Sequence, residues 1–230
     1  MVMKLRRYRR PLLQWGTHRY MGPHIYVGLI KDETFVTLSQ MVEQSQESVK
    51  DMLCHTTTHN NRLEFTDKAE HYNALEDIYT HIQKFTEGHN EQDWHDIDEF
   101  ELSNVWVNIQ HANQHIGHHT HEEADIAFVV YTKNTVSDPT IGHDYQDRSV
   151  DDPVDGMIEW RYGEVHQWSP NRMLHFPTQK EIVVFPGWLE HGVGTNLKDH
   201  ARVSLSFNVE VVELNELPSS NYRRFTNAQK

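Results

Sequence analysis

Residues 117–131 read GHHTHEEADIAFVVY, and this stretch decides what the chain can fold into and what it can bind. Three histidines and three carboxylates come immediately before the apolar run 126–131, which has the composition of a buried strand. Side chains alternate along an extended chain, so His119 and His121 project to the same side. A carboxylate a little further on would complete one face of an octahedral metal ion. Two nitrogens and one oxygen on one face, with the opposite face open, suit non-haem Fe(II).

Length and composition indicate one domain, or one domain with an extension. The chain has 230 residues, 37% of them hydrophobic, which is enough for a sizeable core. No window approaches the eighteen apolar residues of a membrane-spanning helix. The basic opening MVMKLRRYRR has no apolar segment after it, so no signal peptide is predicted. Cys54 is the only cysteine, which excludes an internal disulfide and favours the cytoplasm.

The net charge of −13 argues against a general role in binding nucleic acid, because phosphate contacts need clustered lysine and arginine. The one basic cluster, Lys4 to Arg10, is interpreted as a solvated terminus. Isolated histidines such as His71 and His81 are interpreted as surface polar residues. With eighteen histidines in the chain, only spacing and context identify a functional one.

Two helices are predicted in the first hundred residues and strands in the rest. Apolar spacing of three, four and seven predicts helices over 37–55, with Thr37 or Ser39 as the cap, and over 67–85, with Gly88 as the stop. The apolar stripe of the second helix includes Tyr72 and Tyr79. Residues 88–98 are expected to connect the helices to the strands, and 132–155 to form a long polar loop. Strands are predicted at 25–30, 105–110, 126–131, 156–162, 181–185 and 202–211.

This order of elements predicts an α+β fold, a jelly-roll or cupin-like barrel with N-terminal helices packed against it. A single domain over residues 1–230 is expected. It would comprise N-terminal strands and a helical layer over 1–99, the barrel over 100–212 and a tail over 213–230.

A second cluster of polar residues lies in 184–208, VFPGWLEHGVGTNLKDHARVSLSFN. His191 follows a strand and a turn, and Arg202 opens the clearest alternating strand in the chain. If the polar face of that strand looks into the barrel, Arg202 and Ser204 share a cavity with the histidines. A buried guanidinium binds a carboxylate through two hydrogen bonds, so this pair predicts a carboxylate clamp.

These motifs resemble those of the 2-oxoglutarate- and Fe(II)-dependent oxygenases of the double-stranded β-helix fold. The usual pattern there is His-x-Asp/Glu, a distal His, and Arg-x-Ser about ten residues on. The chain looks most like a branch common in marine phages and bacteria, and the match covers roughly residues 100–212. The segments that carry it are Trp106-Val-Asn108, His119-Thr-His121, Ala127-Phe-Val-Val-Tyr131, Phe185-Pro-Gly-Trp-Leu-Glu-His191 and Arg202-Val-Ser204. Trp106 and Trp188 are expected in the core.

The chain departs from that pattern at His121, where the superfamily mostly has Asp or Glu. Three ligand sets follow. The favoured one is His119, His121 and His191, with Asp125 as a fourth ligand or a neighbour of the ligands. The others are His121, Glu123 and His191, and His119, Asp125 and His191. His-x-His-x3-Asp also resembles a cupin motif on the same barrel.

The resemblance implies an Fe(II) enzyme with 2-oxoglutarate as co-substrate, and hydroxylation as the default reaction. No catalytic residue beyond the metal ligands is expected. Arg202 and Ser204 would hold the far carboxylate of 2-oxoglutarate, with Asn108 as a further contact. The expected partners are dioxygen and a small-molecule or peptidyl substrate, without membrane or nucleic acid, and a homodimer is compatible with the sequence. The alternatives are a cupin-type metal enzyme that uses no 2-oxoglutarate, and a non-catalytic metal-binding or structural barrel.

Overall fold

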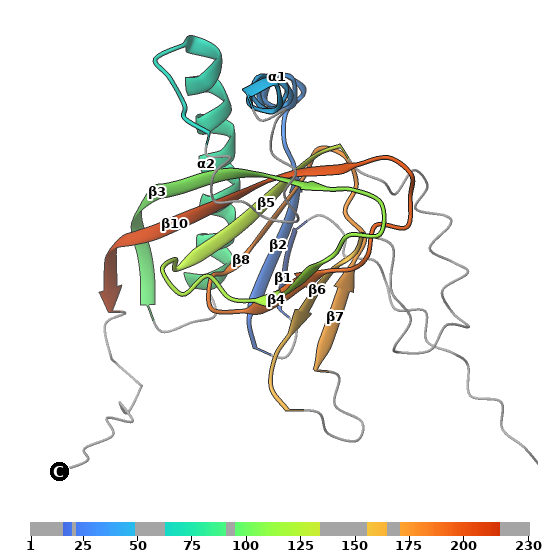
Figure 1. Cartoon of the computed structure of the whole chain (residues 1–230). Helices are drawn as coiled ribbons and strands as arrows, with labels where there is room; N and C mark the ends of the chain where they lie inside the picture. Colours follow the sequence, from blue (N-terminus) through green and yellow to red (C-terminus); the bar gives the residue numbers. More distant parts are fainter. Residues whose placement is uncertain are drawn as a thin grey trace, which may run out of the picture.

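Two antiparallel sheets face each other, and two helices cover the outer face of the larger one (Figure 1). The computed structural model describes residues 16–19, 22–48, 63–90, 95–133, 156–164 and 171–216. The larger sheet has the strand order β1-β2-β8-β5-β10-β3, and the smaller sheet has the order β4-β9-β6-β7. The strands of the larger sheet are β1 (Gly16–Arg19), β2 (His24–Leu29), β8 (Glu181–Pro186), β5 (Ile126–Lys133), β10 (Arg202–Glu216) and β3 (His95–Gln110). Those of the smaller sheet are β4 (Ile116–His119), β9 (Glu190–Val193), β6 (Ile158–Arg161) and β7 (Arg172–His175).

The larger sheet is buried on both faces, because it lies between the helices and the smaller sheet. Successive residues of β5 alternate between the two cores: Phe128 and Val130 pack on the helix side, and Ala127, Val129 and Tyr131 pack on the side of the smaller sheet. This is why β5 is a continuous apolar run without polar alternation. The architecture confirms the predicted fold class of a jelly-roll barrel with helices packed on it.

Strand β10 turns its polar face into the space between the sheets. Val203, Leu205, Phe207 and Val209 belong to the helix-side core. Because side chains alternate along a strand, the residues between them point into the barrel. These are Arg202, Ser204, Ser206 and Asn208. This inward polar face supplies Arg202, Ser204 and Asn208 to the candidate site described below.

Helix α1 (Asp32–Ser48) begins five residues before the predicted start at residue 37. Asp32 and Glu33 occupy its first turn, where carboxylates interact favourably with the helix dipole. The Thr37 hydroxyl donates to the carbonyl of Glu33 one turn earlier (3.0 Å), so Thr37 is inside the helix and does not cap it. Residues 49–62, which include the predicted end of this helix and Cys54, lie outside the described ranges.

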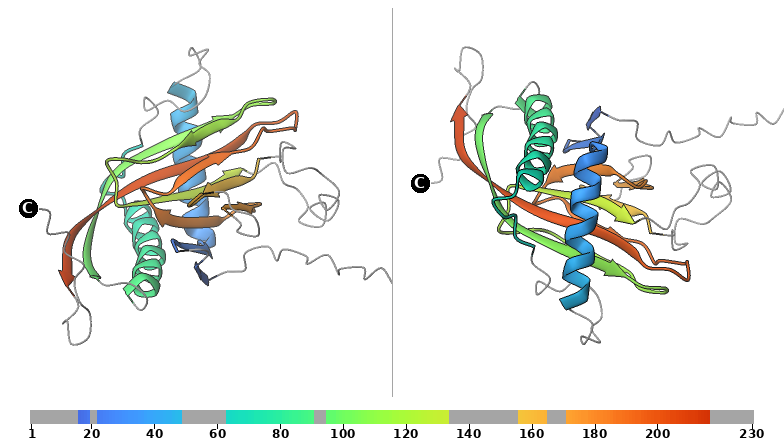
Figure 2. Two further views of the ribbon diagram at one scale, coloured as in Figure 1. Left: turned by 90° about the horizontal axis from the view of Figure 1, so that it is seen from below. Right: turned by 90° about the horizontal axis from the view of Figure 1, so that it is seen from above.

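Helix α2 (Ala69–Asn90) continues past Gly88, so that glycine is not the stop. A glycine within a helix costs about 1 kcal/mol relative to alanine, which tertiary packing readily offsets. Figure 2 shows both helices lying across the same face of the larger sheet.

The buried face of α2 differs from the predicted stripe. Tyr72 and Tyr79 are exposed, while Asp77 and His81 are buried. The Tyr26 hydroxyl and His81 Nδ1 are hydrogen-bonded at 2.8 Å. The backbone N–H of Lys31 donates to Asp77 at 2.8 Å. Polar residues can occupy the core side of this helix because these partners satisfy them. The surface interpretation of His81 is therefore wrong, and so is that of His71, which is also buried.

The antiparallel pair formed by strands β3 and β10 is longer than the sequence pattern indicated. Strand β3 starts at His95, inside the predicted connector, and β10 runs to Glu216, inside the predicted tail. Register shifts interrupt their ladder between Asn208 and Val209 and again after Val211, which breaks the period-two pattern. Strands β4, β7 and β9 have four residues each and were not predicted. Thr132 and Lys133 complete β5, while residues 134–155 of the predicted loop and Lys4 to Arg10 lie outside the described ranges.

In the parts of the chain that the structure describes, neither helix has the length and apolar character needed to cross a lipid bilayer.

Candidate metal centre and carboxylate pocket

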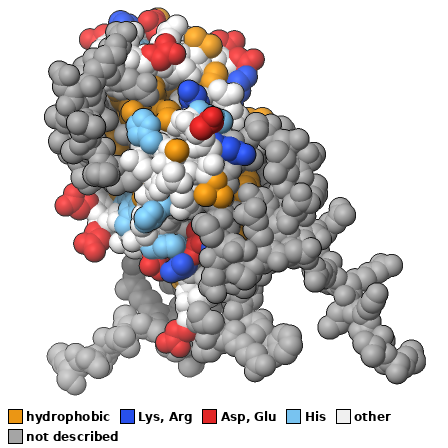
Figure 3. Space-filling model, turned by 45° about the vertical axis from the view of Figure 1, so that its right-hand side comes forward, with side chains coloured by type: hydrophobic (Ala, Val, Ile, Leu, Met, Phe, Trp, Pro, Cys, Tyr) orange, Lys and Arg blue, Asp and Glu red, His pale blue; other side chains and the backbone are white. Residues whose placement is uncertain are grey.

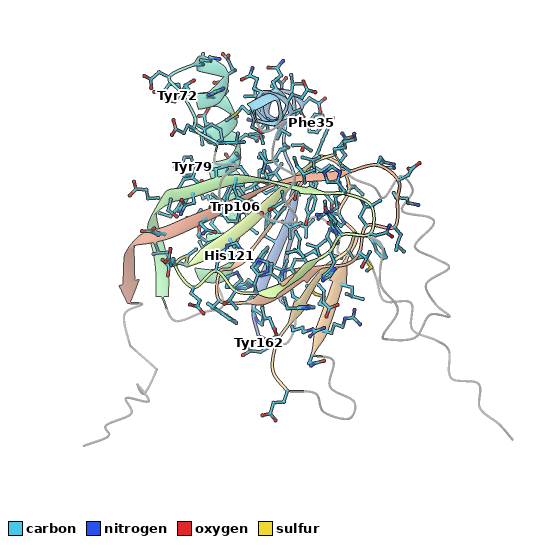
Figure 4. The ribbon with its side chains drawn as sticks, viewed as in Figure 1. Phe35, Tyr72, Tyr79, Trp106, His121 and Tyr162 are labelled. Carbon is cyan, nitrogen blue, oxygen red and sulfur yellow. The ribbon has the colours of Figure 1, made fainter. Side chains whose placement is uncertain are left out.

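Three histidines from two distant segments meet at one end of the barrel. His119 is the last residue of β4, His121 lies in the turn to β5, and His191 lies in β9 directly opposite His119 in the ladder. One ring nitrogen of each lies within 4.8 Å of the others. Figure 4 shows His121 among the side chains of this region. The sequence predicted this trio, and the β4–β9 ladder is what brings its two halves together.

Each imidazole of the trio is held through Nδ1 by an oxygen atom. The acceptors are the carbonyl of Gly117 for His119 (2.8 Å), the carbonyl of Leu189 for His191 (2.8 Å) and Oδ1 of Asn208 for His121 (2.5 Å). A carbonyl oxygen only accepts, so we assign the proton of each ring to Nδ1. Nε2 is then the unprotonated nitrogen of each ring, the one that can bind a metal, and the bond on the other nitrogen orients the ring.

The electrostatic environment of His191 keeps its imidazole neutral. Burial, and after it the neighbouring His119, lower the pKa of His191 to about 3. Neutral imidazole is the form that binds metal. At neutral pH, His191 therefore needs no deprotonation before it binds an ion.

Asp125 is not brought to the trio. Its Oδ2 accepts the backbone N–H of Val211 (2.8 Å), and its own N–H donates to the carbonyl of Val209 (3.1 Å). The carboxylate thus joins the β4–β5 turn to β10. Glu123 in the same turn is exposed. Among the described residues, the one cluster suited to a metal consists of the three histidines and no carboxylate.

His118 points away from the trio, as alternation along β4 requires. Its Nε2 lies 3.1 Å from Glu159 on β6, which also binds Arg161 (2.6 Å). Trp106, by contrast, projects into the barrel, with its ring 5.6 Å from that of His121. The tryptophan is buried as expected, and it forms a wall of the metal site.

Deeper in the barrel, Arg202 is 1% exposed, and its guanidinium is only partly paired. Nη1 donates to Oε1 of Gln110 at 3.3 Å, and the guanidinium carbon lies 4.9 Å from the centre of the Tyr131 ring. Nε and Nη2 are buried without a hydrogen-bond partner, and so is the Tyr131 hydroxyl. Burial lowers the pKa of Arg202 and raises the pKa of Tyr131 to about 12.

The guanidinium and the Tyr131 hydroxyl also interact with each other, and an anion between them would satisfy the buried donors that remain. A carboxylate is the group that a guanidinium fork and a phenol bind best. The pocket is therefore suited to the far carboxylate of a dicarboxylic acid that reaches toward the trio.

Ser204 and Asn108 lie between the trio and Arg202, opposite each other in the β3–β10 ladder. Both are buried. The Asn108 amide donates to Ser206 (2.6 Å), and its Oδ1 is without a partner. Trp106, Asn108 and Gln110 alternate along β3, so one strand face runs from the metal site to the guanidinium.

Sequence reasoning missed three residues of this site, namely Tyr131, Gln110 and Asn208. Tyr131 was counted only as part of an apolar strand. Its pairing with Ser204 in the β5–β10 ladder places it beside Arg202. Asn208 continues the inward alternation from Arg202 through Ser204 and Ser206, and that periodicity was the available signal.

The fold and the site together define a barrel that could hold a metal ion beside a buried pocket suited to a carboxylate. Comparisons with known proteins agree. The model of a family described as "Putative 2OG-Fe(II) oxygenase" matches residues 104–208, which contain the trio and Arg202. A comparison with curated proteins found no match.

Solved structures with a similar fold include AviO1 from Streptomyces viridochromogenes Tue57 (TM-score 0.54, 10% identity, covering 84% of this chain and 92% of that one). A prolyl-4-hydroxylase from Pseudomonas putida has a TM-score of 0.50 at 10% identity, covering 81% of this chain and 86% of that one. HygX from Streptomyces hygroscopicus, with nickel and 2-oxoglutarate bound, has a TM-score of 0.50 at 11% identity, covering 82% of each chain. At these identities the similarity shows the fold alone.

The family match covers residues 104–208, somewhat less than half of the chain, and the fold agrees with it. The family match and the three-histidine cluster support a 2-oxoglutarate-dependent dioxygenase that uses Fe(II) and 2-oxoglutarate.

Proposed function

We propose that this oxygenase hydroxylates a C–H bond, with its metal held by Nε2 of His119, His121 and His191. The observation that carries the ligand set is the convergence of the three rings, whose ligand atoms lie within 4.8 Å of one another while an oxygen accepts from Nδ1 of each ring. Three imidazoles are neutral ligands, so the double charge of Fe(II) is not offset by a protein carboxylate. The anionic co-substrate then supplies the compensating charge.

Arg202 is proposed to hold the far carboxylate of 2-oxoglutarate. Nε and Nη2 would donate the two hydrogen bonds of its fork, and the Tyr131 hydroxyl a third. Ser204 and Asn108 are further proposed contacts along the molecule. This pocket fixes the direction of the co-substrate, with its other end toward the trio.

Fe(II) and 2-oxoglutarate, when bound, supply the oxidising power for C–H cleavage. The contribution of the chain is to position them and to exclude water. Trp106 and Phe185 pack against the trio, with ring centroids 5.6 Å from His121 and 4.6 Å from His191 respectively. These apolar walls strengthen the electrostatic interactions at the metal.

The cupin-type alternative accounts for the trio and leaves the pocket unexplained. An enzyme without 2-oxoglutarate has no need of a fully buried guanidinium with two free donors. The buried Arg202 therefore favours the oxygenase.

Anaerobic titration of the full chain with Fe(II) and 2-oxoglutarate tests the proposal. The expected result is the weak visible charge-transfer band of the chelate, which Arg202→Gln shifts to much higher 2-oxoglutarate concentration. Metal uptake without the band would support the cupin reading. Absence of metal uptake would support a non-catalytic barrel.

Two further points belong to the proposal. The motifs quoted above support kinship with the branch found in marine phages and bacteria. The single cysteine supports a cytoplasmic location, because the chain relies on no internal disulfide. Residues 1–230 are proposed to act as one domain.

A further inference from the structure

Two aromatic side chains are exposed side by side at the end of the barrel that holds the trio. Trp188 is 55% exposed and Tyr162 43% exposed, and their ring centroids lie 5.9 Å apart. We call them the aromatic pair. Trp188 was expected in the core, and its exposure overturns that expectation. Single exposed apolar residues are ordinary, but two large rings in contact beside an active site mark a binding surface.

The aromatic pair is attached closely to the trio. Trp188 precedes His191 by three residues, so their Cα atoms are at most about 11 Å apart. Tyr162 follows β6, in which Trp160 is directly opposite His191. Figure 4 places Tyr162 on the side of the barrel away from Tyr72 and Tyr79.

Backbone contacts fix the turn that precedes Trp188 and support the Tyr162 ring. The carbonyl of Gly187 accepts the N–H of His121 (2.8 Å), and the N–H of Gly187 donates to the carbonyl of Asp125 (2.8 Å). The turn that carries Trp188 is thereby joined to the turn that carries His121. The Tyr162 ring lies against Gly22, where a Cβ would come within 2.9 Å of Cε1. A surface fixed in advance loses little entropy when it binds.

Exposed carboxylates lie close in sequence to Trp188 and to the trio. Glu122 and Glu123 are exposed in the β4–β5 turn, and Glu190, two residues after Trp188, is exposed at the start of β9. The basic residue nearest in the ladder, Arg161, is bound to Glu159 at 2.6 Å. Figure 3 shows histidine side chains gathered on one face of the molecule, with acidic and basic side chains beside them. The chain as a whole is acidic, with a net charge of −13.

Aromatic faces and carboxylates share one preferred ligand. The face of a tryptophan or tyrosine ring carries negative electrostatic potential and attracts ammonium and guanidinium groups. Carboxylates bind the same groups by charge and hydrogen bonds. Charge complementarity therefore points to a cation.

We propose that the substrate of this oxygenase is a peptide segment with a lysine or arginine, whose charged group lies on the aromatic pair. His119, at the mouth, is itself exposed, so the trio is open to a segment laid across the surface. The cation on the rings and nearby carboxylates would hold the segment while one of its C–H bonds faces the metal. The inference that the peptide is a substrate rests on the proposed oxygenase function, although binding of the peptide does not require catalysis.

Binding of three short peptides to the full chain tests the inference, both without added metal and with Ni(II) and 2-oxoglutarate. The peptides are acetyl-Gly-Gly-Lys-Gly-Gly-amide and the same sequence with norleucine or glutamate at the centre. The lysine peptide is expected to bind at least about 5-fold more tightly than the norleucine peptide, as a cation–π contact and one charge pair predict. Binding is expected to weaken with added salt, because the carboxylates are exposed.

Variants separate the aromatic pair from unspecific attraction. Trp188→Ala is expected to weaken binding of the lysine peptide about 5-fold or more, and Trp188→Phe to restore most of it. Tyr72→Ala, which removes an equally exposed ring from α2, is expected to change nothing. The inference would be overturned if all three peptides bound equally, if the glutamate peptide were preferred, or if no peptide bound. It would also be overturned if free cadaverine bound and the lysine peptide did not, or if Trp188→Ala left binding unchanged.

The test also distinguishes this inference from the proposed function. If the lysine peptide binds through Trp188 and no charge-transfer band forms with Fe(II) and 2-oxoglutarate, the cation site stands and the oxygenase proposal fails. If the band forms and the peptide does not bind, the oxygenase stands and the substrate inference fails.

Discussion

Oδ1 of Asn208 lies 2.5 Å from Nδ1 of His121, and this bond couples the last barrel strand to the metal site. Alone among the trio, His121 is oriented by a side chain rather than by a backbone carbonyl. The bond sets both the tautomer and the direction of Nε2. The role of Asn208 can therefore be tested by substitution, which the backbone contacts of His119 and His191 do not allow.

Asn208→Ala is expected to lower metal affinity about 10- to 100-fold, because His121 loses the acceptor that fixes its ring. Asn208→Asp keeps an acceptor at the same position and is expected to retain most of the affinity. Calorimetric titration with Ni(II) measures both variants. If the alanine variant binds metal as tightly as the natural chain, Asn208 does not position His121.

Arg202→Gln is expected to weaken 2-oxoglutarate binding at least about 30-fold, since truncating one partner of a buried charge pair costs about 2–5 kcal/mol. Metal affinity measured without 2-oxoglutarate is expected to stay the same, because Arg202 does not touch the trio. Arg161→Gln is a matched control, since Arg161 pairs with Glu159 on the other face of the smaller sheet. An equal loss of 2-oxoglutarate affinity in both variants would contradict the pocket assignment.

Gly187→Ala is expected to damage the metal site from outside it. A Cβ at residue 187 would overlap the carbonyl oxygen of Ala124, so the β4–β5 turn that carries His121 must move. We expect lower thermal stability, by more than about 2 kcal/mol, and weaker metal binding. Gly117→Ala is the control, because no atom lies within 4 Å of a Cβ there. Similar unfolding and metal-binding curves for the two variants would contradict the packing described here.

The stability of the metal-free chain is expected to fall as the pH drops below about 6.5. The pKa of His191 is about 3 in the folded state and 6.5 in an exposed chain. Between these values the unfolded state binds a proton at His191 that the folded state excludes, so acid favours unfolding. The stabilisation is complete above the higher pKa and is lost as the pH falls toward the lower one.

From pH 6.5 to 4.5 the loss at His191 is about 2–3 kcal/mol. Urea unfolding of the natural chain and of His191→Gln over this range measures it, and the difference between the two isolates this residue from the other titrating groups. The variant is expected to have the flatter pH dependence. Parallel curves would mean that His191 is protonated at the same pH in both states.

Much of the site follows from local sequence pattern. The alternation of Val203 and Leu205 with Arg202 and Ser204 predicts one apolar and one polar face, and the helices cover the apolar one. The spacing of His119 and His121 predicts two imidazoles on one side of the chain. Both predictions rest on the period of two in a strand, which the sequence displays directly.

The rest depends on contacts between distant segments. Nothing near Asp125 in sequence indicates that its carboxylate binds the N–H of Val211, so it was a reasonable candidate for the metal. Tyr79 appeared to belong to the apolar face of its helix, and Asp77 did not. Asp77 is nevertheless buried, because the backbone N–H of Lys31 donates a hydrogen bond to its carboxylate inside the fold. The sequence of a helix does not indicate which polar partners another element will supply to it.

The most direct test of the central claim is a crystal structure of the chain with Ni(II) and 2-oxoglutarate, in which anomalous scattering locates the metal. The account predicts three bonds of about 2.0–2.1 Å from Nε2 of His119, His121 and His191, a range typical of imidazole on a divalent metal. It also predicts the far carboxylate of 2-oxoglutarate on Arg202. A metal bound by Asp125 or Glu123, or a 2-oxoglutarate molecule whose carboxylate lies away from Arg202, would contradict it.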